Sequence, residues 1–272
     1  MSNFICPVCG KEMISSQKIV SCINNHNFDV SKSGYINLLL SQQEKTKNHG
    51  DDKLMVLSRQ KFLNKGYYNI LLNNIKLIFE KYLKNDNNIL DGGCGECFYT
   101  SNICDYLTEK KVNYNMLAVD ISKDALNVGG KRNKNIELAV ASIYHLPIKE
   151  KFCDIILNFF APLCLEEFNR VIKDDGIIIK VVPLEKHLWS LKKIVYDNPY
   201  ENEIEDYSLE GFKLIEKQEV KDIITLHSNE DIINLFKMTP YCYKTSYENI
   251  QRLDNIEELN CEIEFGILIY QK

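Results

Sequence analysis

The pattern of apolar and polar positions changes twice along this chain. Between residues 51 and 84, apolar side chains recur at helical spacing after two aspartates, and Gly66 divides the run into two expected helices. From Ile89 onward, short runs rich in isoleucine, leucine and valine alternate with helical patterns. Strands that alternate with helices build a parallel sheet with helices on both faces. The chain is therefore expected to be an α/β protein.

These expected elements can be assigned to residue ranges. The apolar runs predict strands at 89–90, 116–122, 136–142, 152–162, 176–183, 223–226 and 261–270. Helical patterns occupy 67–83, 123–132, 162–172 and 229–238. This order predicts a doubly wound parallel sheet, and such sheets bind their ligand at the carboxyl ends of the strands.

A glycine-rich turn follows the first of these strands. Asp91 ends the strand, and Gly93 and Gly95 would let the backbone approach a ligand at a helix N-terminus. The second strand ends in Asp120, which is placed to accept hydrogen bonds from the two hydroxyls of a ribose. An acid before the loop, without the third glycine of a dinucleotide motif, favours S-adenosylmethionine (SAM) over a nicotinamide or flavin nucleotide.

The same turn contains a Cys-x-x-Cys pair, Cys94 and Cys97. A pair of this form after a strand and before a helix is also typical of thioredoxin-type redox sites. The neighbouring glycines, Asp120 and the lack of a proline between the two cysteines speak against that interpretation.

The N-terminal segment combines three cysteines and a histidine at the spacing of a metal site. Cys6 and Cys9 form one Cys-x-x-Cys pair, and Cys22 and His26 follow after twelve intervening residues. Four nitrogen and sulfur ligands complete a tetrahedral zinc site with no open position, so the metal would be structural. Apolar pairs at 13–14 and 19–20 flank a short polar stretch and predict a hairpin within this segment, folded by zinc binding.

Charge separates the N-terminal third from the rest of the chain. Of the 272 residues, 1–84 include 12 lysines and arginines against 6 acids, whereas 85–272 include 21 against 32. A basic segment on an acidic body suggests a polyanionic partner. The sequence has neither an apolar run of about 20 residues nor a signal-peptide pattern, which predicts a cytoplasmic protein without membrane contact. In that reducing location, cysteines serve as metal ligands or buried side chains.

Taken together, these motifs resemble a known family, the bacterial 23S rRNA (guanine-N1)-methyltransferases, some of which confer macrolide resistance. The resemblance spans nearly the whole chain. It rests on the four metal-ligand positions and on the segments HNFDVSKSGYINLL, GDDKLMVLSRQKFLNKGYY, LDGGCGE, FAP, EEFNRVIKDDG, HLWSLKKIVY and MTPY.

The resemblance implies an organisation and a reaction. It implies a zinc-binding RNA-recognition domain at 1–40, a helical linker at 41–84 and a Rossmann-like, SAM-dependent methyltransferase domain at 85–272. The substrate would be N1 of a guanine in a 23S rRNA hairpin, and the protein would act as a homodimer.

The resemblance also assigns roles to individual residues. Cys6, Cys9, Cys22 and His26 would bind zinc. Gly95 and Glu96 would lie on the SAM loop, and Tyr68 and His187 would lie close to SAM. Cys97 departs from the family, which has a small glycine at that position.

Other roles and two other functions stay open. Guanine N1 carries a proton that a base or water must remove, and the sequence does not identify that base. Phe159 and Phe160 could stack on the target base, which would be flipped out of its hairpin, or pack in the core, and Phe160 could instead pack on the methionine moiety of SAM. Tyr35, Lys32 and Lys45–Lys47 are expected RNA contacts. The alternative functions are a small-molecule SAM methyltransferase and a non-catalytic zinc-ribbon adaptor for nucleic acid.

Overall fold

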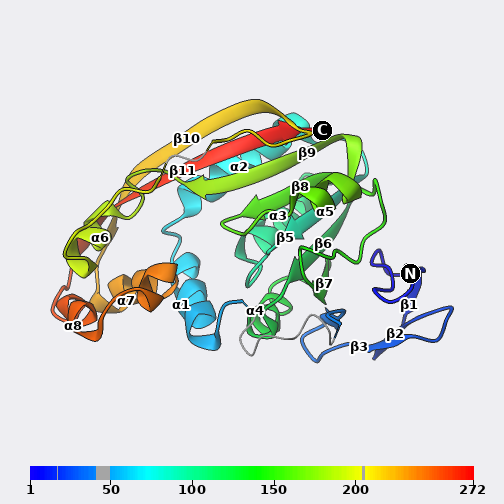
Figure 1. Cartoon of the computed structure of the whole chain (residues 1–272), viewed down its shortest axis with the longest axis horizontal. Helices are drawn as coiled ribbons and strands as arrows, with labels where there is room; N and C mark the ends of the chain where they lie inside the picture. Colours follow the sequence, from blue (N-terminus) through cyan, green and yellow to red (C-terminus); the bar gives the residue numbers. More distant parts are fainter. Residues whose placement is uncertain (17, 41–49, 204–205) are drawn as a thin grey trace.

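A computed structural model describes residues 1–16, 18–40, 50–203 and 206–272, which form a small and a large sheet (Figure 1). The small sheet is antiparallel and has the order β1-β2-β3, with β1 at Met13–Ser15, β2 at Ile19–Cys22 and β3 at Asn27–Asp29. The hairpin expected from the N-terminal pattern is thus confirmed. The large sheet has the order β10-β11-β9-β8-β5-β6-β7-β4. Its strands are β4 Ile36–Asn37, β5 Asn87–Gly92, β6 Tyr114–Asp120, β7 Ile136–Val140, β8 Cys153–Phe159, β9 Ile172–Pro183, β10 Lys213–Leu226 and β11 Leu259–Gln271.

The large sheet is mixed rather than wholly parallel. The strands from β9 through β4 run parallel, as expected, but β11 runs antiparallel to β9 and β10 runs antiparallel to β11. The predicted strand at 223–226 is only the end of β10, whose other residues are mostly charged and exposed or half-buried. An antiparallel edge strand can keep one face in water, so its polar pattern concealed it from an analysis of apolar runs.

Helices connect these strands close to the predicted ranges. They are α1 Lys53–Asn64, α2 Asn69–Tyr82, α3 Phe98–Glu109, α4 Lys123–Gly129, α5 Leu165–Val171, α6 Trp189–Val195, α7 Asn229–Lys237 and α8 Tyr247–Ile250, with 3₁₀ turns η1 Pro240–Tyr243 and η2 Gln251–Leu253. Asp52 caps α1 by accepting a hydrogen bond from the Met55 N–H at 2.9 Å. Gly66, at a φ of +84°, separates α1 from α2 as predicted. The sequence analysis assigned no residue range to α6 or α8.

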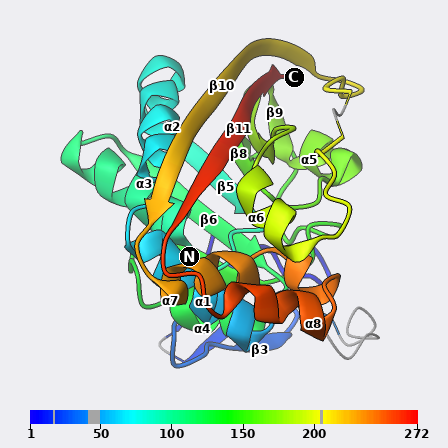
Figure 2. The ribbon, with the colours of Figure 1, turned by 90° about the vertical axis from the view of Figure 1, so that its left-hand side faces the viewer.

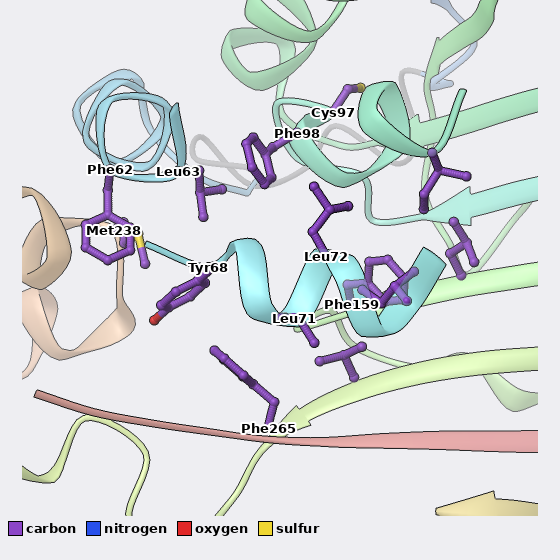
Figure 3. Packing of buried hydrophobic residues seen from close by; sticks show 14 of the residues in the cluster. Phe62, Leu63, Tyr68, Leu71, Leu72, Cys97, Phe98, Phe159, Met238 and Phe265 are labelled. Atoms are coloured by element: carbon purple, nitrogen blue, oxygen red, sulfur yellow. The ribbon is translucent and has the colours of Figure 1, made fainter. Parts of the chain in front are cut away.

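Apolar side chains pack on both faces of the large sheet. On one face, α2 and α3 contribute a cluster that joins Leu71, Leu72 and Tyr68 to Phe159 and Phe265 of the sheet (Figure 3). On the other face, Phe168 of α5 shares a second cluster with buried residues of the N-terminal segment, among them Phe4 and Met13. The long strands β10 and β11 arch over the molecule beside α2 (Figure 2).

The N-terminal segment contacts the rest of the protein through strand pairing and a hydrogen bond, in addition to the covalent chain. Strand β4 pairs with β7 and thereby extends the large sheet. The Ile5 N–H also donates to the Pro147 carbonyl at 2.8 Å. This lobe and the helices α6, α7 and α8 lie at opposite ends of the molecule (Figure 1). Within the described ranges, no helix has the length and apolarity needed to cross a bilayer.

Candidate metal centre and active-site cavity

The four predicted metal ligands converge around one point. Their donor atoms all lie within 4.8 Å of one another, and the four residues are Cys6, Cys9, Cys22 and His26. The Cys9 and Cys22 sulfurs are 3.7 Å apart, and His26 Nδ1 lies 3.5 Å from Cys6 Sγ and 3.4 Å from Cys22 Sγ. A tetrahedral zinc ion with Zn–S bonds of about 2.3 Å places neighbouring ligands about 3.5–3.8 Å apart. The donor set and its spacing therefore fit one structural zinc ion.

The local backbone prepares a thiolate for this metal. A hydrogen bond from the Lys11 N–H is the main reason that the pKa of Cys9 is lowered to about 6. Burial raises the pKa of Cys6, although backbone hydrogen bonds from Val8 and Cys9 oppose that rise. Zinc binds the deprotonated thiol, so these N–H groups favour the metal-bound form.

A cavity of about 790 Å³ opens at the carboxyl ends of the parallel strands. It lies between the loops that follow β5, β6, β7, β8 and β9, the segment before α1, the second half of α1 and the turn before η1. All seven predicted cofactor residues line it: Tyr68, Asp91, Gly93, Gly95, Glu96, Asp120 and His187. This volume is within the range of about 300–1,000 Å³ that small-molecule sites occupy.

One side of the cavity is acidic and poorly solvated. Burial raises the pKa of Asp91 to about 7, although the Thr100 hydroxyl donates to its carboxylate. Burial also raises the pKa of Glu96 to about 7, against the opposing effect of its ion pair with Arg132. The pKa of Asp120 is raised for the same reason, while its carboxylate accepts from the Gly95 and Ser122 N–H groups at 2.8 Å. Such an environment favours a cationic ligand.

Several polar atoms on this side have no partner in the described structure. Asp91 Oδ1, Glu96 Oε1 and the Tyr99 hydroxyl are buried without a hydrogen bond. Buried polar atoms are rarely left unpaired. These atoms therefore fit a ligand that carries both positive charge and hydrogen-bonding groups.

The glycine loop has the conformation that its residues suggested. Gly93 and Gly95 have φ values of +89° and +54°. A Cβ at Gly93 would lie 2.5 Å from the Ala161 Cβ, so this glycine allows the loops after β5 and β8 to meet. Cys97 also has a positive φ, +61°, where an L side chain is strained. Cys97 thus occupies a backbone conformation suited to glycine, the residue that the resemblance implies at this position.

Another side of the cavity wall is aromatic. The Tyr68 hydroxyl lies 3.4 Å from His187 Nε2, and the Tyr68 ring packs edge-on against Phe265 with centroids 4.9 Å apart. Phe159 is only 7% exposed and belongs to the core, whereas Phe160 is 45% exposed at the cavity wall. Phe160 also has a φ of +55°, and non-glycine strain of this kind clusters at functional sites.

Family comparison identifies the two parts of the chain. Residues 83–251, more than half of the sequence, match a family model described as "Methyltransferase domain", and residues 4–47 match one described as "RlmA, N-terminal", a zinc ribbon. The chain belongs to the methyltransferase-domain family. The match confirms the predicted enzyme class and its zinc ribbon, and with them SAM as the cofactor and zinc as the structural metal.

Curated relatives support the same resemblance. The chain is 27% identical to a Bacillus subtilis (strain 168) protein named "Putative 23S rRNA (guanine-N(1)-)-methyltransferase YxjB", over all of this chain and 98% of that one. It is 28% identical to a Streptomyces fradiae protein named "23S rRNA (guanine(748)-N(1))-methyltransferase", over 68% of this chain and 65% of that one. The resemblance expected from the sequence motifs is thus confirmed.

The methyltransferase cavity includes residues to which sequence analysis gave no role. Arg59 of α1 forms an ion pair with Asp51 at the cavity wall, and its Nη2 donates to the Met238 carbonyl at 3.2 Å. Met238 begins the MTPY segment, all four residues of which line the cavity. Both segments contributed to the resemblance, so their motifs were visible, but only the fold shows that they meet.

Two further expectations can be compared with the methyltransferase structure. The Cys94 and Cys97 sulfurs are 3.7 Å apart. Burial raises the pKa of Cys94 well above its usual value, so the reactive thiolate of a redox pair is disfavoured.

Among the expected RNA contacts, Lys32 is exposed and Tyr35 is half-buried on the N-terminal lobe, while Lys45–Lys47 lie outside the described residues.

Proposed function

We propose that this protein transfers a methyl group from SAM to N1 of a guanine in 23S rRNA. The observation that carries the proposal is the cavity wall, which combines unpaired carboxylate oxygens with an exposed aromatic ring. The names of the curated relatives supply the position on the base and the class of RNA.

The acidic side of the cavity would hold the cofactor. Asp120 is placed for the ribose hydroxyls, and Gly93 and Gly95 let the loop backbone approach the ligand. The unpaired oxygens of Asp91 and Glu96 would face its positive charge and hydrogen-bond donors. Tyr68 and His187 would contact the same ligand from the aromatic side.

The aromatic side would hold the target base. The exposed ring of Phe160 offers a stacking surface for guanine, whereas buried Phe159 supports that loop from the core. A base inside a hairpin could enter this cavity only after it has been flipped out of its helix. The stacked base would then be aligned with the methyl carbon, which is the main contribution of the site to the rate.

SAM supplies an electrophilic methyl carbon, and the protein must dispose of the guanine N1 proton. His187 is unsuited to take it, because Nδ1 already accepts the Glu264 N–H at 3.1 Å and burial lowers the pKa of the imidazole to about 3. Tyr68 stays protonated, because burial raises its pKa well above the usual value. Both residues therefore act as neutral positioning groups.

The N-terminal lobe, with Lys32 as one contact, and the basic segment 41–84 that follows it would bind the RNA backbone of a hairpin. A homodimer would place two such lobes on one RNA, and the sedimentation or light-scattering mass of the purified protein tests that part. We place the reaction in the cytoplasm, where ribosomal RNA is made and where cysteines stay out of disulfides, as the ten of this chain do.

The decisive experiment examines 23S rRNA from a strain that lacks this gene. Mass spectrometry of nuclease fragments should show the loss of one N1-methylguanosine, and purified protein with SAM should restore it. An Asp120→Ala variant, expected to lose SAM, is the matched negative control. Unchanged rRNA in the deletion strain would refute the proposal. Methyl transfer to small molecules alone would favour the small-molecule enzyme, and the absence of SAM binding would favour the adaptor.

A further inference from the structure

A buried lysine lies behind the cavity wall among three tyrosines. Lys192 of α6 is 0% exposed, and its Nζ lies 5.0 Å from the centroid of the Tyr200 ring and 5.3 Å from that of Tyr241. Tyr196 lies between them, with its ring 5.7 Å from Tyr200 and 6.1 Å from Tyr241. We call these four residues the Lys192 cluster. Lys192 and Tyr196 belong to the segment HLWSLKKIVY, and Tyr241 belongs to MTPY.

The lysine is an unusual component of this interior. Within the described part of the chain it has no carboxylate in ion-pair contact, and burial lowers its pKa. Its ammonium instead donates to the Tyr200 carbonyl at 3.1 Å and to Asn202 Oδ1 at 2.6 Å. Burying a cation is costly, and the charge of Glu201, which is not in ion-pair contact, offsets that cost only in part. The contacts it makes fix the backbone of the loop that carries Tyr200.

The three rings form a continuous path from solvent to the cavity. Tyr200 is 52% exposed and stacks on Tyr196 at an interplanar angle of 27°. Tyr196 meets Tyr241 edge-on at 74°, and Tyr241 lines the cavity. Tyr200 is therefore a fixed, exposed aromatic surface two rings away from the cavity.

We propose that Tyr200 stacks on an unpaired RNA base that neighbours the methylated guanine. This inference rests on the proposed function and adds a second RNA contact at the end of the molecule opposite the zinc lobe. Unpaired bases are bound by stacking on aromatic side chains, whatever their sequence. A ring that is already held by Tyr196 and Lys192 loses little conformational entropy when the base binds. Flipping the guanine leaves its neighbours unstacked, and Tyr200 would replace that lost stacking.

The charge around Tyr200 separates this contact from phosphate binding. The adjacent Glu201 would repel phosphate, and the Lys192 ammonium is enclosed. Loss of Tyr200 should therefore weaken RNA binding without changing the slope of log K against log salt. Loss of a phosphate-binding lysine such as Lys32 should lower that slope.

The test uses the full-length protein and an rRNA fragment that the wild type methylates. Tyr200→Ala should raise the KM and Kd for RNA about five- to hundred-fold, with the Kd for SAM unchanged. Tyr200→Phe should restore binding, because the ring is retained. Tyr247→Ala removes a 75% exposed tyrosine outside the cluster and should behave like wild type.

An abasic substitution on either side of the guanine identifies the stacked base. At one of these positions, the Kd of the wild-type protein for abasic RNA should equal the Kd of Tyr200→Ala for intact RNA. Tyr200→Ala should bind that abasic RNA no more weakly than it binds intact RNA. Three results would each overturn this contact. They are an RNA affinity of Tyr200→Ala equal to that of the wild type, additive losses at both abasic positions, and a salt slope that differs from that of the wild type. If the wild type methylates no RNA, the proposed function fails first and this inference fails with it.

Discussion

The Tyr68 hydroxyl and His187 Nε2 meet at 3.4 Å in the cavity wall, although 119 residues separate them in the sequence. The Glu264 N–H donates to His187 Nδ1, so the single proton of the neutral ring lies on Nε2 and points toward Tyr68. The imidazole thereby orients the tyrosine hydroxyl. Because burial and the nearby Lys192 ammonium lower the pKa of His187 to about 3, this arrangement persists across the working pH range.

The first prediction concerns this pair. Tyr68→Phe and His187→Gln should each weaken SAM binding about two- to tenfold, the value of one neutral hydrogen bond. Because each change breaks the same contact, the double variant should lose little more than either single variant. Isothermal titration calorimetry with SAM measures all four proteins. Fully additive losses would mean that the two side chains act separately.

The second prediction is that SAM binds more tightly as the pH rises from about 6 to 8. Asp91 and Glu96 have pKa values of about 7 in the free protein, so both are partly protonated near neutrality. A bound sulfonium favours their charged forms, and binding must then release protons. Calorimetry at pH 6.5 in buffers of different ionisation enthalpy should show that release. S-adenosylhomocysteine lacks the positive charge, so its affinity should depend less on pH.

The same two acids affect the stability of the cofactor-free protein. Their pKa values are higher in the folded state than in the unfolded state, where they are about 4. The folded protein therefore holds more protons between about pH 4 and 7, and this contribution to stability falls as the pH rises through that window. Thermal unfolding should show a larger SAM-induced increase in Tm at pH 8 than at pH 6. An increase that does not depend on pH would contradict the coupling.

The third prediction concerns two adjacent glycines at the end of α4. A Cβ at Gly129 would lie 2.7 Å from Cys97 Sγ on the SAM loop, whereas a Cβ at Gly130 would lie 2.1 Å from the Ser33 carbonyl oxygen of the N-terminal lobe. Overpacking of this kind costs about 1–3 kcal/mol, more than the helix propensity that alanine gains. Gly129→Ala should therefore weaken SAM binding, while Gly130→Ala should disturb the N-terminal lobe and leave SAM binding closer to normal.

A second substitution tests whether Cys97 is the obstacle. Cys97→Gly removes the sulfur and also suits the positive φ at that position. The Gly129→Ala/Cys97→Gly double variant should recover most of the lost SAM affinity and Tm. If the double variant is no better than Gly129→Ala, the clash lies elsewhere, for example with the Glu96 backbone, which a Cβ at Gly129 would approach to 3.3 Å.

Local patterns were enough to predict the zinc ligands and the glycine loop. Four ligands within 21 residues, and a strand that ends in Asp91 before two glycines, are constrained by short-range geometry. The position of Asp120 followed from the order of strands and helices. These features depend on neighbours in sequence or on the regular repeat of the fold, so the residues themselves carry the information.

Long-range packing decided what the sequence did not show. Arg59 reaches the cavity because α1 packs against α7 and the turn that follows it, and nothing in its local pattern distinguishes it from a surface arginine on a helix. The burial of Phe159 beside the exposure of Phe160 depends on a positive φ at one residue. The Lys192 cluster likewise combines α6, the loop after it and η1, and a lysine in a helix gives no sign that it will be buried.

The fourth prediction is that zinc removal affects the N-terminal lobe far more than the cofactor site. The purified protein should contain one zinc ion per chain, and Cys22→Ser should lose it. Without the metal, Phe4, Met13 and their neighbours must be held by burial alone in a lobe too small to fold by itself. Hydrogen exchange should then become fast through residues 1–37, including the β4 pairing with β7.

RNA affinity should fall at least tenfold when zinc is removed, whereas the Kd for SAM should change less than about threefold, because no cofactor-side residue belongs to that lobe. An equal loss of RNA and SAM affinity would show that the lobe and the cavity unfold as one unit. The connection would then be α4, because Ser33 Oγ of the lobe donates to Asn127 Oδ1 of that helix at 3.2 Å.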